Sequence, residues 1–261
     1  MHPNLFHIGN LTLPTFGALA AIGLMLALAL SLRTARIIGI DPDKLWDAGL
    51  FAVMAAFIAS RLILIATHFA AFRQYPILLL AVPSLTATGL LLTLIVSFLW
   101  LYFKRIPVLP ALDAWTPCAT LVWAFLALGH HFEGSDPGMP TILPWGVPMP
   151  GETTPLHPIA IYAAATALIL TVTAYAGLKR TNTAAFTLIA AGTAQFLLTF
   201  VRQPGDPTIG GLDALQLVCL GMMAAGCTLS FAASRNRGRR AVSQSPLDDD
   251  ALNQDRGQRQ V

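Results

Sequence analysis

Charged residues are scarce in this chain of 261 residues. Asp, Glu, Lys and Arg together make up 11% of it, whereas hydrophobic residues make up 55%. A soluble globular domain carries about 25% charged residues. The composition therefore excludes an ordinary soluble domain, and it indicates an integral membrane protein whose apolar surface faces lipid.

Cysteine is also rare, with three residues in the chain. Cys118, Cys219 and Cys227 all lie in apolar segments and have no regular spacing. This pattern excludes a disulfide framework and a cysteine-based metal cluster, and it is typical of small core residues. No cluster of basic residues is interleaved with aromatic residues, so we expect no nucleic-acid partner.

The chain contains many long apolar runs. A membrane-spanning helix needs about 20 apolar residues, and seven segments meet that requirement. They lie at about 11–32, 45–70, 77–103, 115–132, 158–178, 183–201 and 212–233. We therefore expect an all-α integral membrane protein with about seven transmembrane helices in residues 1–233. Residues 234–261 are polar without apolar periodicity, which predicts a disordered tail.

The positions of the basic residues predict the orientation in the membrane. Most of the 16 Lys and Arg residues follow the first, third, fifth and seventh apolar runs. Because positively charged loops stay in the cytoplasm, the N-terminus is expected outside and the C-terminus in the cytoplasm. Arg61, Arg73 and Arg202 depart from this pattern and fall toward the outer face, so they require a different explanation.

The connection between the fourth and fifth runs is rich in proline. The segment "EGSDPGMPTILPWGVPMPGETTPLHP" contains seven prolines and no Lys or Arg. Proline fixes φ and removes a hydrogen-bond donor, so we expect an ordered, irregular outer loop without a long helix. Loops of this length usually have a function.

Polar side chains from four predicted spans fall at one outer level. They are Arg61 in span two, His130, His131 and Glu133 at the end of span four, His157 and Tyr162 at the start of span five, and Gln195 and Arg202 near the end of span six. Ionisable groups are costly inside a membrane and usually functional there. Their convergence predicts a site that opens to the outer leaflet.

Several motifs resemble the prolipoprotein diacylglyceryl transferase family over roughly residues 8–230. They are "LPALDAWTP", "ALGHHFEG", "MPTILPWGV", "LHPIAIY", "GTAQFLLTFVRQPGD" and "LQLVCLGMM". The resemblance implies a seven-span enzyme of the bacterial inner membrane. Such an enzyme moves the diacylglyceryl group of phosphatidylglycerol to the thiol of a lipobox cysteine in a prelipoprotein, and it releases glycerol phosphate. Phosphatidylglycerol and a lipobox peptide are thus the implied partners, and no cofactor is implied.

The family residues are kept only in part. Ala127, Leu156 and Gln195 stand where the family has arginine, and Ala163 and Thr199 where it has glutamate. The residues to which the resemblance assigns substrate binding are Arg202, Arg61, Gln195, Tyr162, Gly129 and Gly134. Arginine suits the lipid phosphate because its planar fork forms bidentate, charge-assisted hydrogen bonds.

Three residues are the catalytic candidates, because a thiol needs a general base. His130 and Glu133 are three positions apart and share a helix face. With His157 opposite, they are predicted to supply the base and its orienting partner. Two alternatives stay open: polar side chains that meet water at a helix end, and a metal site made by the same three residues. No tight ligand spacing demands a metal, so we expect none.

Two further functions are compatible with the sequence. The missing family residues favour a catalytically degenerate paralogue that binds lipid or acts on another lipid or acceptor. A small-solute transporter is the third hypothesis, but such proteins usually show internal repeats and broken helices near the midplane.

Overall fold

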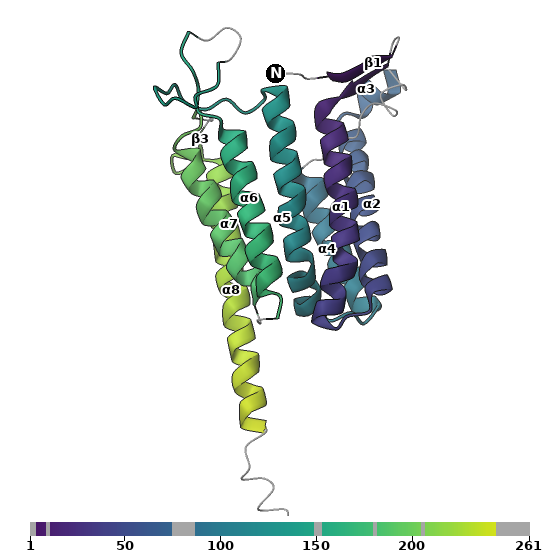
Figure 1. Cartoon of the computed structure of the whole chain (residues 1–261). Coiled ribbons are helices and arrows are strands. Elements are labelled where there is room, and N and C mark those ends of the chain that lie inside the picture. Colours follow the sequence, from purple (N-terminus) through teal and green to yellow (C-terminus); the bar gives the residue numbers. More distant parts are fainter. Residues whose placement is uncertain are drawn as a thin grey trace, which may run out of the picture.

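The protein is described from a computed structural model, which covers residues 4–8, 11–74, 87–148, 153–179, 182–204 and 207–243. These residues form eight helices and two hairpins (Figure 1). The helices are α1 (Thr15–Ile38), α2 (Pro42–Thr67), α3 (Phe69–Gln74), α4 (Ala87–Phe103), α5 (Val108–Glu133), α6 (Ile159–Gly177), α7 (Thr183–Thr199) and α8 (Ala214–Ser243). The antiparallel hairpins pair β1 (Asn4–Ile8) with β2 (Leu11–Pro14), and β3 (Pro207–Ile209) with β4 (Leu212–Asp213).

Long apolar helices dominate the fold. In the described part of the chain, α1, α2, α5, α6 and α8 are long and apolar enough to cross a membrane, and α4 and α7 are shorter apolar helices. The prediction of an all-α integral membrane protein is confirmed at this level. The number of seven spans and the orientation stay predictions.

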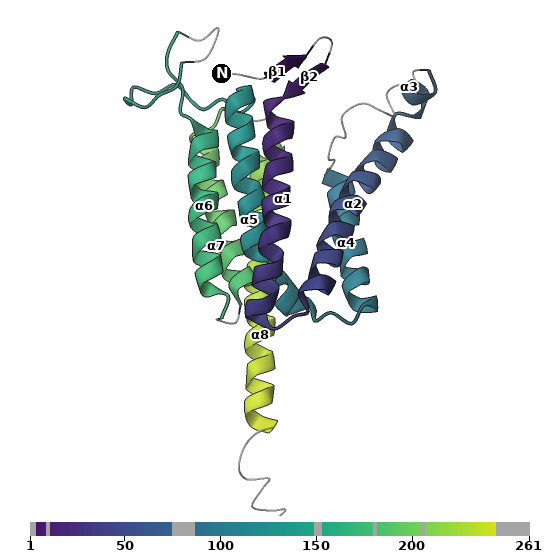
Figure 2. The same ribbon diagram turned by 45° about the vertical axis from the view of Figure 1, so that its right-hand side comes forward.

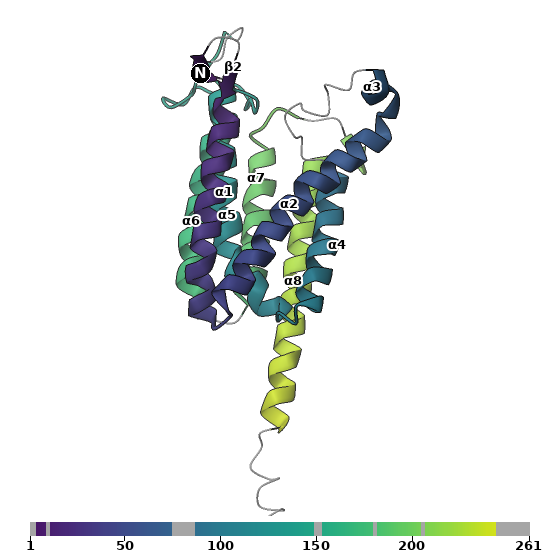
Figure 3. The same ribbon diagram turned by 90° about the vertical axis from the view of Figure 1, so that its right-hand side faces the viewer.

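Helix pairs define two parts of the bundle. The closest packing joins α1 to α5, α5 to α6, and α7 to α8, while α2 packs mainly on α4. The α2–α4 pair leans away from α1 and α5 at the end that carries α3 (Figures 2 and 3). At the opposite end a buried cluster joins α1, α2, α4 and α5; it consists of Ala35, Leu45, Ala48, Leu101, Ile106, Ala111 and Ala114.

Small residues allow the helices to approach closely. A Cβ on Gly23 of α1 would lie 2.5 Å from Cβ of Phe125 in α5. A Cβ on Gly192 of α7 would lie 2.9 Å from the backbone oxygen of Cys219 in α8. Helix association in lipid depends on such close packing, since the hydrophobic effect does not drive it there.

The structure shifts two predicted boundaries. The first apolar run was expected to be helical from about residue 11, but Leu11–Pro14 form strand β2 and the helix begins at Thr15. At the other end, α8 continues to Ser243 and projects beyond the other helices (Figure 1). Extending an existing helix costs little, because each added residue forms one further hydrogen bond. Residues 244–261 of the predicted tail lie outside the described residues.

Candidate functional site

The connection between α5 and α6 is an ordered cap over one end of the bundle. Its described residues, 134–148 and 153–158, contain no helix, as predicted. Isolated bridges pair Pro140 and Val147 with Leu156, and Gly138 with Arg202 just beyond α7. A Cβ on Gly138 would overlap His157, so this crossing requires glycine. The cap therefore holds the start of α6 and the end of α7 together.

An ion pair connects the cap to the segment after α7. Nε of Arg202 lies 2.8 Å from Oδ1 of Asp136, and their side chains are 38% and 20% exposed. Oδ1 of Asp136 is buried and has no aligned hydrogen-bond donor among the described residues. The guanidinium of Arg202 therefore compensates this carboxylate by charge. A guanidinium carries five donors in a planar fork, more than this one contact uses.

His130 is held by the turn that ends α5. Gly134 adopts the left-handed conformation with φ 71° and caps the helix, and its N–H donates to the backbone oxygen of His130 over 2.9 Å. This turn brings the hydroxyl of Ser135 to 2.8 Å from Nδ1 of His130. The predicted partner, Glu133, is exposed and does not line the pocket that His130 lines. In the described residues His130 therefore pairs with Ser135 and not with Glu133.

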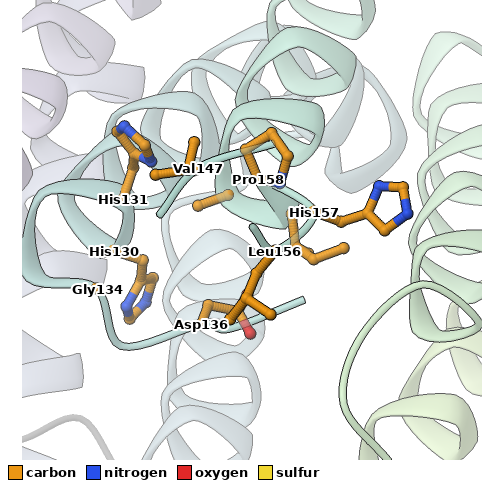
Figure 4. A pocket seen from close by; sticks show the side chains of 10 residues that line it. His130, His131, Gly134, Asp136, Val147, Leu156, His157 and Pro158 are labelled. Carbon is orange, nitrogen blue, oxygen red and sulfur yellow. The ribbon is translucent and has the colours of Figure 1, made fainter. Parts of the chain in front are cut away.

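A small pocket lies between the end of α5 and the start of α6. His130, His131, Asp136, Leu156 and His157 are among its lining residues, and its volume of about 10 Å³ has room for roughly one water molecule. Figure 4 shows the rings of His130 and His131 on one side of the pocket, while the ring of His157 points away on the opposite side.

The three predicted catalytic residues therefore do not form one cluster. The described residues hold no group of three His, Cys, Asp or Glu side chains able to share a metal ion. The catalytic roles of His130, Glu133 and His157 stay predictions, but the predicted His130–Glu133 pair does not carry them. Sequence spacing did not predict the contact with Ser135, because the left-handed turn at Gly134 that brings Ser135 to His130 lies beyond the helix.

His157 belongs to a different polar cluster. Nε1 of Trp145 donates a hydrogen bond of 2.7 Å to the hydroxyl of Tyr162, and Nδ1 of His157 lies 3.4 Å from the same hydroxyl. Tyr162 stands in the first turn of α6, after Pro158. The sequence did not distinguish Trp145, since tryptophan is common at membrane interfaces for other reasons. The structure reveals its contact with Tyr162, because the loop that carries Trp145 returns to the start of α6.

The two predicted glycines have structural roles. A Cβ on Gly129 would lie 2.7 Å from Cδ2 of Phe16 in α1, so this position serves the α1–α5 contact. Gly134 serves the C-cap described above. Substrate contact by either glycine stays a prediction.

Arg61 lies in the α2–α4 part of the bundle. Its guanidinium carbon is 5.4 Å from the ring centroid of Phe72 in α3, a cation–π distance. The interaction joins α2 to α3. Arg61 thus contacts α3, whereas Arg202 contacts the cap.

Gln195 faces a large apolar groove between α4, α5, α7 and α8. The groove has a volume of about 590 Å³. Its lining is mostly apolar and includes Leu94, Trp115, Ala119, Leu188, Met222 and Gln195. Oε1 of Gln195 is buried and has no hydrogen-bond partner among the described residues. A groove of this composition suits hydrocarbon chains rather than a polar solute.

These features define a class of protein: a multi-pass membrane protein with a polar cluster under a fixed cap and an apolar groove among its helices. A family model of prolipoprotein diacylglyceryl transferase matches residues 3–232, and the chain belongs to that family. The resemblance predicted from the motifs is confirmed.

Curated relatives carry the name phosphatidylglycerol–prolipoprotein diacylglyceryl transferase. The protein of Synechococcus elongatus is 29% identical over 179 residues, which cover 64% of this chain and 62% of the relative. The protein of Trichormus variabilis is 26% identical over 171 residues, 61% of each chain. That of Thermosynechococcus vestitus is 28% identical over 160 residues, 59% of this chain and 60% of the relative. The chain thus spans about three fifths of the length of these relatives.

Proposed function

We propose that the protein is a diacylglyceryl transferase of the bacterial inner membrane. It moves the diacylglyceryl group of phosphatidylglycerol to the thiol of a lipobox cysteine in a prelipoprotein. One observation carries the proposal: the apolar groove includes Gln195 of α7, and Arg202 follows seven residues later, just beyond the end of that helix and beside the cap. This arrangement offers a place for acyl chains and, farther along, a cation for the lipid phosphate.

The same proposal includes seven spans and the predicted orientation. The apolar helices α4 and α7 join the five long ones as spans. Each has 17 residues, which corresponds to a length of about 25 Å at 1.5 Å per residue, so the bilayer thins slightly around them. With the N-terminus outside, the cap and the polar cluster meet the outer leaflet. Phosphatidylglycerol and an exported lipobox peptide both reach the site from that side.

The chemistry requires a base, a carbon electrophile and a stabilised leaving group. The cysteine thiol gives its proton to the base, and the thiolate sulfur attacks the terminal glyceryl carbon of the lipid. A C–S bond forms as the C–O bond to phosphate breaks, and glycerol phosphate leaves with the electron pair. Arg202 is suited to bind that phosphate, since a guanidinium carries five donors and its Nε contact with Asp136 accounts for one of them. His130 is the candidate base at the end of α5.

The test is transfer by the purified protein from phosphatidylglycerol to a lipobox peptide. Arg202→Ala is expected to lower turnover by about 10²- to 10³-fold, the effect of losing one preorganised donor. Arg73→Ala is the matched control, because Arg73 is exposed on α3 and away from the cap. Equal turnover in the two variants would remove Arg202 from the proposed site.

The second candidate is a lipid-binding paralogue without turnover. Ala127 and Ala163, which stand at arginine and glutamate positions of the family pattern, lie in a buried α5–α6 cluster. Leu156 at another arginine position is 1% exposed and belongs to the core of the cap. These positions are packed with apolar side chains and cannot contact a phosphate. Retention of phosphatidylglycerol without transfer would favour this function.

A further inference from the structure

The cluster of Trp145, Tyr162 and His157 has a defined direction of hydrogen bonding. Indole Nε1–H is only a donor, so the hydroxyl oxygen of Tyr162 accepts from Trp145 over 2.7 Å. The hydroxyl proton of Tyr162 is then available to another acceptor. Nδ1 of His157, 3.4 Å away, can be that acceptor in the tautomer that carries the ring proton on Nε2.

The acceptor role of Nδ1 determines the other ring nitrogen. A neutral imidazole carries one proton, so an accepting Nδ1 places the proton on Nε2. The rings of His157 and Tyr162 are 6.2 Å apart between centroids and tilted by 58°. Figure 4 shows the His157 ring directed away from His130 and His131. Nε2–H is therefore not presented to that histidine pair.

We propose that Trp145 and Tyr162 are positioning residues that hold His157 in the tautomer with the proton on Nε2, so that Nε2 is a hydrogen-bond donor. The acceptor for Nε2–H is the anionic phosphate of the lipid headgroup, and this assignment rests on the proposed transferase function. His157 then stabilises the leaving phosphate, and the proton of the thiol goes to a different group. The sequence-based assignment of a base role to His157 is replaced by a donor role.

Nitrogen NMR of the full-length protein in lipid nanodiscs tests the hydrogen bonds independently of activity. The histidine ring nitrogens are labelled, and the spectrum is recorded at alkaline pH, where imidazole is neutral. The signals of His157 are identified by their loss in His157→Gln. The expected spectrum has an unprotonated Nδ1 whose resonance is displaced by an accepted hydrogen bond.

Two variants and a control define the outcome. Tyr162→Phe is expected to return the Nδ1 resonance to the position of a non-bonded nitrogen, and Trp145→Phe to move it part of the way. Tyr175→Phe, near the far end of α6, is expected to leave it unchanged. A protonated Nδ1 in the unmodified protein, or an Nδ1 signal that neither substitution moves, would overturn the proposal.

The donor role has its own test in amide variants. The amide nitrogen of glutamine can take the place of Nε2, while that of asparagine takes the place of Nδ1. His157→Gln is expected to retain transfer within about tenfold, and His157→Asn to lose about 10²- to 10³-fold, since only the first keeps the donor. Equal loss in both variants would overturn the donor role. Absent transfer in the unmodified protein, with the expected NMR shifts, would instead refute the transferase function and leave the hydrogen-bonded cluster intact.

Discussion

Substitution of Gly129 separates packing from substrate binding. In the structure, a Cβ at this position would lie 2.7 Å from Cδ2 and 3.3 Å from Cα of Phe16. Such overlap forces α1 and α5 apart, and overpacking of this kind costs about 1–3 kcal/mol. Gly129→Ala also gains about 1 kcal/mol of helix propensity. Gly221→Ala in α8 is the matched control, because a Cβ there meets nothing within 4 Å.

The difference in the free energy of unfolding between the two variants therefore measures the cost of the steric overlap with Phe16. Gly129→Ala is expected to unfold with a free energy about 1–3 kcal/mol lower than that of Gly221→Ala. For a chain of this size, that difference lowers the melting temperature by about 2–12 °C. The assay is thermal unfolding in detergent, followed by circular dichroism.

A second substitution tests whether the ring of Phe16 is the cause of the destabilisation. In a Phe16→Leu background, part of the overlapping ring is removed, so the destabilisation by Gly129→Ala is expected to shrink to less than about 1 kcal/mol. If Gly129→Ala instead melts like Gly221→Ala and loses phosphatidylglycerol, the packing argument is refuted. Gly129 would then contact substrate, as the family resemblance implies.

Two further predictions concern the groove and the helix contacts. Leu188→Trp places a larger ring in the apolar groove and is expected to lower the phosphatidylglycerol retained in native mass spectrometry by severalfold. Val172→Trp, on the exposed face of α6, is expected to retain the lipid. Equal retention in the two variants would exclude the groove as the lipid site. Thr171→Val removes a hydrogen bond of 2.9 Å from α6 to Thr120 of α5 and is expected to cost about 0.6 kcal/mol. Thr173→Val is the control, because it removes hydrogen bonds within its own helix only. A larger drop in melting temperature for Thr173→Val than for Thr171→Val would contradict the interhelical role of Thr171.

The fold class was predictable because it depends on local composition. Each apolar run contains in its own residues the reason to form a helix in lipid, since all backbone groups must pair within the segment. The irregular cap was predictable for the same reason, because its prolines prevent a helix wherever the loop lies. The exception at Leu11–Pro14 arises from pairing with β1, a contact between segments that composition alone does not specify.

The site was only partly predictable. The structure places His130, His157 and Arg202 beside the cap, while the shared depth in the membrane from which they were grouped stays a prediction. The sequence did not predict which polar side chains contact one another. Arg202 contacts Asp136, which the sequence did not distinguish, and Arg61 contacts Phe72 of α3.

The sequence by itself determined that this is a membrane protein of the prolipoprotein diacylglyceryl transferase family, since hydropathy and motif residues are properties of the chain alone. The tertiary structure decided the partners of the polar side chains. His130 meets Ser135 because a left-handed turn follows α5, and His157 meets Tyr162 because the cap returns to α6. Hydrogen bonds and close ion pairs require distances of about 3 Å. A change of backbone direction at a single residue therefore changes which side chain a polar group can reach.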